Sequence, residues 1–331
     1  MKLSVVIPTF NRKDSLQCTL DGLARQQYPV TEFEVVVVSD GSTDGTMEML
    51  AEYALTAPYP IRVVNQANGG PSRARNRGIQ EAQHEVIVFL DDDVEPVPEF
   101  LCRHAIHHQQ DEKIAVVGPM SPDPARATAE PAWIAWEHAK LQEVYDMFRA
   151  GGDCFGRAPG PLIFYSGNAS VRKQWLLKAG GFDESFTRQE DVELALRMHR
   201  TCDLSFVYDF AADGIHRPQR SFEAWLRIPN SYGAFDAQRI RTGLLQWSDV
   251  QKNIKKRNPA TRILASLCLA CPPLLPLSVT VLRRSSLLCY RAGKKATALA
   301  ALSVLYNICY IYAAMQSKPM GMRGKPSSVL P

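Results

Sequence analysis

The chain has 331 residues, of which 46% are hydrophobic and 22% are charged. It can therefore bury a real core, in one large unit or two compact ones, which excludes an unfolded chain. The net charge of +4 is divided unevenly, because residues 251–331 contain 13 basic residues and no acidic one, while residues 1–250 hold 25 basic against 34 acidic residues. This division predicts an acidic soluble portion followed by a basic tail for an anionic surface.

Short apolar runs alternate with helical patterns over the first 118 residues. We expect buried strands at residues 3–7, 33–38, 61–64, 86–90 and 114–117, with helices in the intervening segments. This alternation predicts a mostly parallel sheet with helices on both faces. The order is less regular after Pro119, where we expect a helix that contains Trp133 and Trp136, and later an amphipathic helix that begins near Asp191.

Three carboxylates, Asp91, Asp92 and Asp93, directly follow the apolar run at 86–90. The carboxyl edge of a parallel sheet is where open α/β folds present the groups that bind ligands. Three crowded acids need a counter-charge, and a hard divalent cation such as Mg²⁺ or Mn²⁺ prefers carboxylate oxygens. The alternative is a polar loop that caps the next helix, but a cap needs one aspartate and not three.

Three further polar loops leave strands at the same expected edge, at residues 9–12, 40–44 and 68–77. Asp40 can accept a hydrogen bond from the ring N–H of a pyrimidine, and Thr9 and Asn11 can line a base and ribose. Arginines after the glycine-rich turn can meet phosphate. Neither G-x-G-x-x-G nor G-x-x-x-x-G-K-[ST] is present, so the sequence does not predict a dinucleotide fold or a P-loop.

Seven strings, in this order and spacing, resemble the family-2 glycosyltransferases, which have a GT-A fold. The strings are VVIPTFNR at 5–12, VSDGSTDGT at 38–46, ARNRG at 74–78, FLDDD at 89–93, SGNASVR at 166–172, GGFDESF at 180–186 and EDVEL at 190–194. The resemblance covers roughly residues 1–220. It implies an α/β GT-A domain that binds a nucleotide sugar.

The resemblance also implies roles for single residues. Those expected to hold the donor are Thr9, Asn11, Arg12, Asp40, Arg75, Asp91 and Asp92. The acidic triplet matches the D-x-D motif of the family, in which Asp93 would bind the metal and Asp91 the ribose or the metal shell. His216 would contact metal or diphosphate.

Asp191 matches the general base of the inverting members, and Glu190 is the alternative base or a group that positions the acceptor. An inverting displacement needs one such base opposite the leaving group.

The resulting hypothesis is a metal-dependent, inverting transferase that moves one sugar from a nucleotide donor to a hydroxyl acceptor, in a glycan or a lipid-linked intermediate. A UDP-sugar is the first expectation, with thymine and guanine nucleotides left open. Residues 219–222 lack the Q-x-x-R-W pattern of processive synthases, which favours one sugar per cycle. The alternatives are a nucleotidyltransferase, which would need a glycine-rich, lysine-containing loop after the first strand, and a non-catalytic nucleotide-sugar binder.

Two apolar segments, 263–282 and 296–315, lie in the basic tail. Both are long enough to span a bilayer, but two spanning helices would place the basic loop between them outside, against the positive-inside rule. We therefore favour interfacial or re-entrant helices on the cytoplasmic face of the inner membrane, then two spanning helices, then a soluble hairpin. Apolar runs outweigh basic ones, so we expect no nucleic acid partner.

The expected domains are a catalytic domain at 1–250, with a nucleotide-binding half at 1–118 and an acceptor-binding half at 119–250, and a membrane-association segment at 251–331. Three histidines, His104, His107 and His108, have helical spacing and are expected on a solvated helix face.

Overall fold

The computed structural model describes residues 1–126, 129–151, 160–186, 188–241 and 245–317. The chain forms two compact units. The first, here called the sheet unit, is Met1–Thr128 with Lys140–Gln219, and the second, the helical unit, is Ala129–Ala139 with Arg220–Pro331. Helix α5 (Ala132–Arg149) contributes residues to both.

The sheet unit contains a seven-stranded sheet in the order β3-β2-β1-β4-β8-β6-β9. Its strands are β1 (Leu3–Thr9), β2 (Phe33–Ser39), β3 (Ile61–Asn65), β4 (Val86–Leu90), β6 (Ile114–Val117), β8 (Asn168–Arg172) and β9 (Ser205–Tyr208). Only β8 runs antiparallel to its neighbours β4 and β6, so the predicted mostly parallel sheet is confirmed. The parallel strands β1, β2 and β4 therefore end at one edge, where their polar loops meet.

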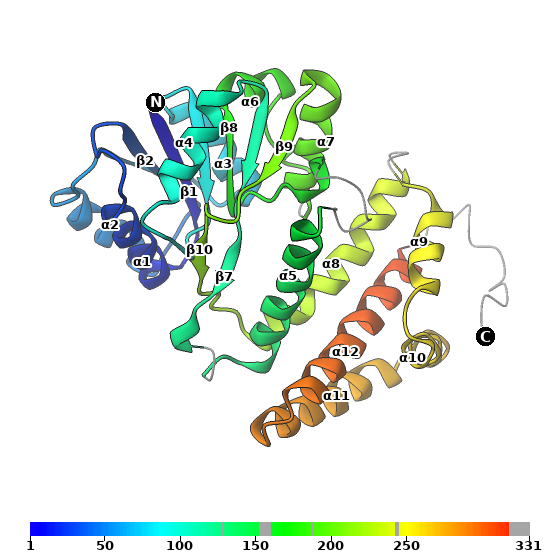
Figure 1. Cartoon of the computed structure of the whole chain (residues 1–331). Helices are drawn as coiled ribbons and strands as arrows, with labels where there is room; N and C mark the ends of the chain where they lie inside the picture. The colour runs from blue at the N-terminus through cyan, green and yellow to red at the C-terminus, as the bar shows by residue number, and fades with distance from the viewer. Residues whose placement is uncertain (127–128, 152–159, 187, 242–244, 318–331) are drawn as a thin grey trace. The chain divides into compact units, whose positions relative to one another are not determined.

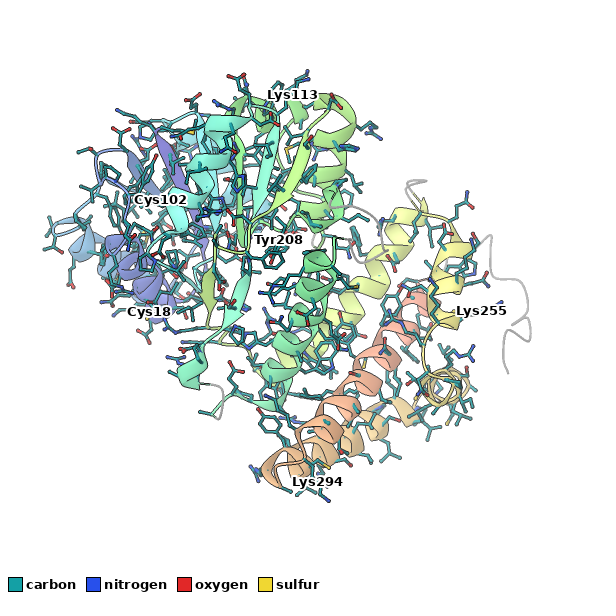
Figure 2. All side chains as sticks on the ribbon, in the orientation of Figure 1. Cys18, Cys102, Lys113, Tyr208, Lys255 and Lys294 are labelled. Carbon is teal, nitrogen blue, oxygen red and sulfur yellow. The ribbon has the colours of Figure 1, made fainter. Side chains whose placement is uncertain are left out.

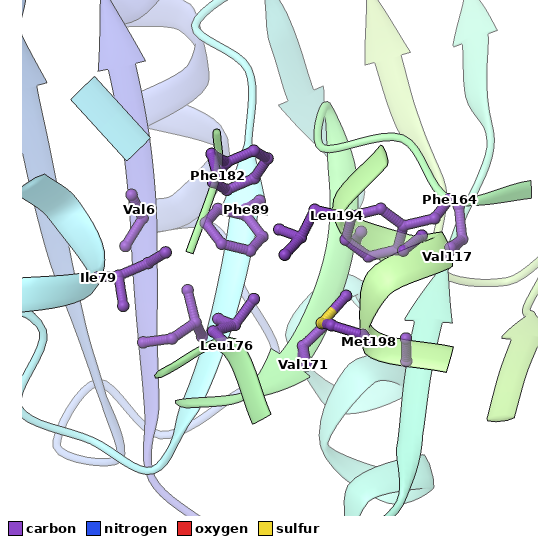
Figure 3. Close-up of a cluster of buried hydrophobic side chains, with 14 of the residues drawn as sticks. Val6, Ile79, Phe89, Val117, Phe164, Val171, Leu176, Phe182, Leu194 and Met198 are labelled. Carbon is purple, nitrogen blue, oxygen red and sulfur yellow. The ribbon is translucent and has the colours of Figure 1, made fainter. Parts of the chain in front are cut away.

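Alternate side chains of these strands point to opposite faces and build two apolar layers. Val6, Phe89 and Val171 belong to the layer drawn in Figure 3, under α3, α6 and α7. Leu3, Val5 and Ile7 belong to the other layer, under α1, α2 and α4. The bounds of these helices are α1 (Lys13–Ala24), α2 (Thr46–Ala54), α3 (Pro71–Glu81), α4 (Phe100–Gln110), α6 (Lys173–Ala179) and α7 (Glu190–Cys202). Helices therefore cover both faces, as the alternation predicts (Figure 1).

A second, three-stranded sheet has the order β5-β10-β7, with bounds β5 (Val94–Pro96), β10 (Gly214–His216) and β7 (Met120–Pro122). The apolar strand β4 ends before the acidic triplet, and β5 begins directly after it. Within this sheet His216 is opposite Val94. The pairing therefore brings residue 216 next to the triplet, although more than a hundred residues separate them along the chain.

The helical unit contains α8 (Phe222–Arg241), α9 (Trp247–Lys255), α10 (Pro259–Ala270), α11 (Leu274–Arg291) and α12 (Lys295–Gln316). Helix α12 packs against α8, α10 and α11. The apolar segment expected at 263–282 is not one helix, because the chain turns at Pro272 and Pro273 and starts again as α11. The tryptophans Trp136 and Trp225 lie in the core of this unit, where they pack edge to face.

The expectation of a solvated histidine face on α4 is wrong for His104 and His108, whereas His107 is 21% exposed and lies 2.8 Å from Asp209 Oδ2. His104 and His108 are fully buried, and one nitrogen of each ring lies 2.8 Å from the Ser170 hydroxyl. His104 Nε2 also lies 3.0 Å from Asn168 Oδ1. Burial lowers the pKa of His104 to about 4 and that of His108 to about 3, so both rings are neutral at pH 7. Hydrogen bonding to β8 explains how two polar rings are buried under the sheet.

Candidate active site

The acidic triplet meets the loop that follows β1. The guanidinium of Arg12 donates to Asp92 Oδ1 at 3.2 Å and also to Asp93 Oδ2. Both carboxylates are nearly buried, and burial raises the pKa of Asp92 to about 7, although Arg12 opposes this. Asp93 raises the pKa of Asp92 further by like-charge repulsion. The guanidinium of Arg12, whose side chain is 30% exposed, therefore joins the loop after β1 to two buried acids at the end of β4.

Arg75 connects the triplet to the start of α7. Its Nη2 donates to Asp91 Oδ1 at 2.8 Å, and its Nη1 donates to Glu190 Oε1 at 3.1 Å. The arginine side chain is 7% exposed, and its guanidinium lies 5.7 Å from the centre of the Phe182 ring. Arg75 is expected to bind the sugar donor. In the structure it also joins Asp91 and Glu190, which are about a hundred residues apart in the sequence.

Replacement of Arg75 by Met should destabilise the fold and remove activity. Asp91 and Glu190 would lose their shared cation, and breaking a mostly buried ion pair costs about 3–5 kcal/mol. The urea midpoint of unfolding measures this loss. Arg75→Lys restores the charge but not the fork, so it should recover only part of the stability. An unchanged midpoint for Arg75→Met would contradict the assignment.

Asp40, at the end of β2, is buried and accepts three hydrogen bonds from the segment after β3. Its Oδ1 accepts from Gln66 Nε2 at 2.8 Å and from the Gly69 amide at 2.9 Å, and its Oδ2 accepts from the Gly70 amide at 2.8 Å. Gly70 has φ +87°, a conformation that favours glycine. Asp40 therefore fixes the turn that leads into α3.

Asn11 joins the loops after β1 and β2. Its backbone N–H donates to Ser42 Oγ at 3.0 Å, and its side-chain Oδ1 accepts from the backbone N–H of Thr43 at 2.7 Å. Asn11 has φ +53°, a left-handed conformation that asparagine tolerates better than most residues. Thr9, the last residue of β1, is buried beside Asp92 and partly offsets the rise in the pKa of that carboxyl. Both residues thus lie at the predicted edge.

Asp191 lies in the first turn of α7, where backbone N–H groups favour a carboxylate. Its Oδ1 accepts from the Val192 amide at 2.8 Å, and its Oδ2 accepts from the Ser166 amide at 3.4 Å. Burial and then the neighbouring Glu190 raise the pKa of Asp191 to about 7, against the amides and Arg75. A carboxylate with a pKa near 7 is suited to accept a proton at neutral pH.

Asp93 and His216 form the part of the site that could hold a cation. Asp93 Oδ1 lies 3.7 Å from His216 Nε2, and two ligands of one ion with bonds of about 2.1 Å are at most about 4.2 Å apart. Within the described ranges, no group of three or more His, Cys, Asp or Glu side chains is arranged to hold a metal. Mg²⁺-type sites, however, use one or two protein carboxylates and complete their shell with substrate phosphates and water. The residues present therefore fit a divalent cation that is shared with a diphosphate.

Gly167 lets the strand β8 approach the triplet closely. The Asp91 amide donates to the Gly167 carbonyl at 3.1 Å, and a Cβ at residue 167 would lie 2.8 Å from Asp91 Oδ2 and 2.7 Å from Met120 Sδ. A side chain at residue 167 would therefore force the side chains of Asp91 and Met120 to move.

Gly167→Ala should displace the Asp91 carboxylate from Arg75 and lower turnover by about tenfold, and it should lower the melting temperature less than Arg75→Met does, because Arg75 keeps its contact with Glu190. Assays of donor consumption and of thermal unfolding measure both effects. Full activity of the alanine variant would show that Asp91 tolerates the shift.

All the expected site residues lie in the sheet unit. The structure brings Arg12 to Asp92 and Asp93, Arg75 to Asp91, and His216 to Asp93. Glu190, which the sequence gives only as an alternative base, is bound by Arg75. Gly167 was not predicted as a site residue, although it lies within the string SGNASVR at 166–172.

Comparison with known proteins gives consistent matches. A family model described as Glycosyl transferase family 2 matches residues 4–168. Validoxylamine A glucosyltransferase of Streptomyces hygroscopicus subsp. jinggangensis is 33% identical in an alignment of 223 positions, gaps included, that covers 60% of this chain and 51% of that protein. Poly(ribitol-phosphate) beta-N-acetylglucosaminyltransferase TarS of Staphylococcus aureus is 39% identical over 93 residues, 28% of this chain and 16% of that protein. The chain thus matches only part of the length of these curated relatives.

Among solved structures, the mannosyltransferase PcManGT from Pyrobaculum calidifontis, in complex with GDP-Man and Mn²⁺, matches with a TM-score of 0.60 and 22% identity. The match covers 97% of this chain and 88% of that chain. At 22% identity, this structural similarity shows that the two chains share a fold.

Proposed function

The chain belongs to glycosyl transferase family 2 and is a glycosyltransferase with a GT-A-like fold, and from this premise we propose the reaction that its site performs. It transfers one sugar from a nucleoside-diphosphate donor to a hydroxyl acceptor, with inversion and with the help of a divalent cation. The observation that supports this best is the convergence of the acidic triplet, Arg75 and the first turn of α7 in one unit.

In this proposal Asp191 is the general base. It accepts the proton of the acceptor hydroxyl while the oxygen attacks the anomeric carbon from the side opposite the diphosphate. The raised pKa of Asp191, about 7, makes the carboxylate a better proton acceptor than an ordinary aspartate. Glu190 stays bound to Arg75, which leaves Asp191 as the carboxylate for proton transfer.

The donor side of the site binds and orients the nucleotide. Thr9, Asn11 and Asp40 line the nucleoside, and Arg12 and Arg75 lie where phosphate oxygens would find cationic donors. A divalent cation bound by Asp93 and His216, with Asp91 and Asp92 beside it, would neutralise charge on the departing diphosphate.

We further propose a UDP-sugar as the donor, a glycan or lipid-linked acceptor, and action at the cytoplasmic face of the inner membrane. Residues 1–250 would form the catalytic domain, with the nucleotide bound by residues 1–118 and the acceptor by residues 119–250. Residues 251–331 would mediate membrane association, which their basic and apolar composition supports.

The test is a panel of nucleotide sugars screened by thermal shift and then by donor consumption, with Mn²⁺, with Mg²⁺ and without metal. A bound donor raises the melting temperature by mass action. The panel should include UDP-, dTDP- and GDP-sugars, with GDP-mannose among them because the Pyrobaculum enzyme was solved with it. Stabilisation by a donor without its consumption, in the presence of acceptor extracts, would instead favour a non-catalytic binder. Formation of a sugar nucleotide from a sugar phosphate would favour a nucleotidyltransferase.

A further inference from the structure

Helix α12 is the one helix, among the described residues, that is long and apolar enough to cross a membrane. Its apolar side chains are already used inside the helical unit, however. Leu302, Leu305 and Ile308 are at most 1% exposed, and α12 packs against α8, α10 and α11. Other helices cover the side of α12 that carries these residues, and 44% of its most apolar stretch is buried, so part of its apolar composition is explained as core of the unit.

Helix α11 has the opposite arrangement. Leu277, Val281 and Leu288 are 58%, 53% and 67% exposed. Their spacing of four and seven residues places them on one side of the helix. Ile263 and Leu267 of the neighbouring helix α10 are also half exposed and four residues apart. We call the α11 residues Leu277, Val281 and Leu288 the outer stripe.

The outer stripe has a basic border. Arg284 and Arg291 are exposed and continue the same spacing along α11, and Lys294 and Lys295 follow at the turn before α12 (Lys294 is labelled in Figure 2). The adjacent Arg283 behaves differently, because it donates to Glu223 at 3.0 Å and covers the ring of Phe222 at 4.2 Å. Arg283 is thus held by residues of α8 at the surface of the unit, whereas Arg284 and Arg291 are exposed.

We propose that the outer stripe of α11 lies flat on an anionic lipid leaflet. Its leucines and valine would enter the boundary between headgroups and acyl chains, while Arg284 and Arg291 would bind lipid phosphates at the same depth. This inference deepens the membrane association proposed above by naming the surface and the lipid charge. It also reassigns the contact from the most apolar helix to an amphipathic one.

Charge complementarity favours lipid over a second copy of the chain. Residues 251–331 contain no acidic side chain, so two copies that met through the outer stripe would bring like charges together. An anionic leaflet provides the missing negative charge, and each basic residue near it contributes about 1 kcal/mol. Binding should therefore weaken as the salt concentration rises, because salt screens these charges.

The test uses the full chain and vesicles of phosphatidylglycerol mixed with phosphatidylcholine, with phosphatidylcholine alone as the comparison. Wild type should sediment with the anionic vesicles only. The double variant Leu277→Asp/Leu288→Asp should lower this binding by about tenfold or more, since it removes apolar anchors and adds negative charge. Arg284→Gln/Arg291→Gln should lower binding to a similar extent, with a smaller dependence on salt.

A matched control comes from the sheet unit. Leu177 on α6 is 58% exposed, the same fraction as Leu277, and Leu55 after α2 is 86% exposed. Leu177→Asp/Leu55→Asp should bind vesicles as wild type does. Circular dichroism and the melting temperature, measured for every variant, separate loss of binding from loss of folding.

Three results would overturn the proposal. They are no sedimentation of wild type with anionic vesicles, wild-type binding by the Leu277→Asp/Leu288→Asp variant, and a change from dimer to monomer in that variant with vesicle binding intact. The last result would make the stripe a contact between copies. The vesicle assay needs no sugar donor, so its failure is distinguishable from failure of the transferase reaction, which the thermal shift with nucleotide sugars tests separately.

Discussion

Asp191→Asn is expected to lower kcat by about 10³-fold, with the Michaelis constant for the donor nearly unchanged. The asparagine keeps the shape and can still accept from the Val192 amide, but it cannot take the proton of the acceptor. Steady-state kinetics with saturating acceptor measure the effect. Glu193→Gln, on the same turn of α7 and paired with Arg197, is the matched control and should keep kcat. Normal turnover in Asp191→Asn with loss in Glu190→Gln would assign the base to Glu190.

The pH dependence provides a second measurement of the same residue. Because the pKa of Asp191 is raised to about 7, the proton-accepting form is present above that pH and is lost as the pH falls through it. Wild-type kcat should thus fall about tenfold per pH unit below 7, whereas an ordinary aspartate would preserve activity to about pH 4. The residual kcat of Asp191→Asn should not fall in this way below pH 7. The kcat of Asp92→Asn should still fall below pH 7, although the pKa of Asp92 is also raised to about 7.

Measurement of folding stability shows whether the loss of kcat in Asp191→Asn comes from the missing base or from misfolding. The folded state holds the proton of Asp191 more tightly than the unfolded chain does, so Asp191 makes the fold less stable as the pH rises from about 4, the ordinary pKa of an aspartate, to about 7, and this loss is complete above pH 7. Asp191→Asn should accordingly be at least as stable as wild type above pH 7. A lower melting temperature there would show that the carboxylate is needed for structure.

Asp93→Asn is expected to remove the dependence of turnover on Mn²⁺ or Mg²⁺ and to lower kcat by about 10³-fold. The substitution removes the carboxylate that faces both His216 and Arg12. Calorimetric titration of Mn²⁺ in the presence of UDP gives a readout that does not require catalysis, and binding should weaken at least tenfold.

Asp203→Asn is the control for Asp93→Asn, because the Asp203 side chain is 91% exposed at the end of α7 and its substitution should leave metal binding unchanged. Removal of the Asp93 charge should also lower the pKa of Asp92, which Asp93 raises. Wild-type Mn²⁺ affinity in Asp93→Asn would place the cation elsewhere.

The sequence predicts the edge of the sheet well, because parallel strands that end in polar loops present those loops together. The fold class, the strand β4 and the start of α7 at the string EDVEL follow from local patterns. The antiparallel insertion of β8 and the three-residue strands β5 and β10 do not, since short strands have no periodicity long enough to recognise. Proximity of His216 to the triplet was therefore implied by family resemblance and not by spacing.

Other differences have equally particular causes. The polar side chains of His104 and His108 predict an exposed helix face. They are buried because they form hydrogen bonds with Ser170, which lies more than sixty positions away in the sequence on β8. The Arg75 bridge from Asp91 to Glu190 is likewise a long-range pairing. The break between α10 and α11, by contrast, is visible in the sequence, because Pro272 and Pro273 cannot continue a helix.

Asp40 combines two tasks in one side chain. The residue expected to recognise the base also fastens the segment 66–70 to the end of β2 through three N–H donors. Substitution of Asp40 would therefore loosen the entrance to α3, the helix that delivers Arg75, at the same time as it removes a nucleoside contact. Such a variant would bind the nucleotide sugar more weakly for two reasons at once, the lost nucleoside contact and the displacement of Arg75. A Gln66 variant loosens the segment but keeps the Asp40 carboxylate, so a comparison of the two variants would separate these causes.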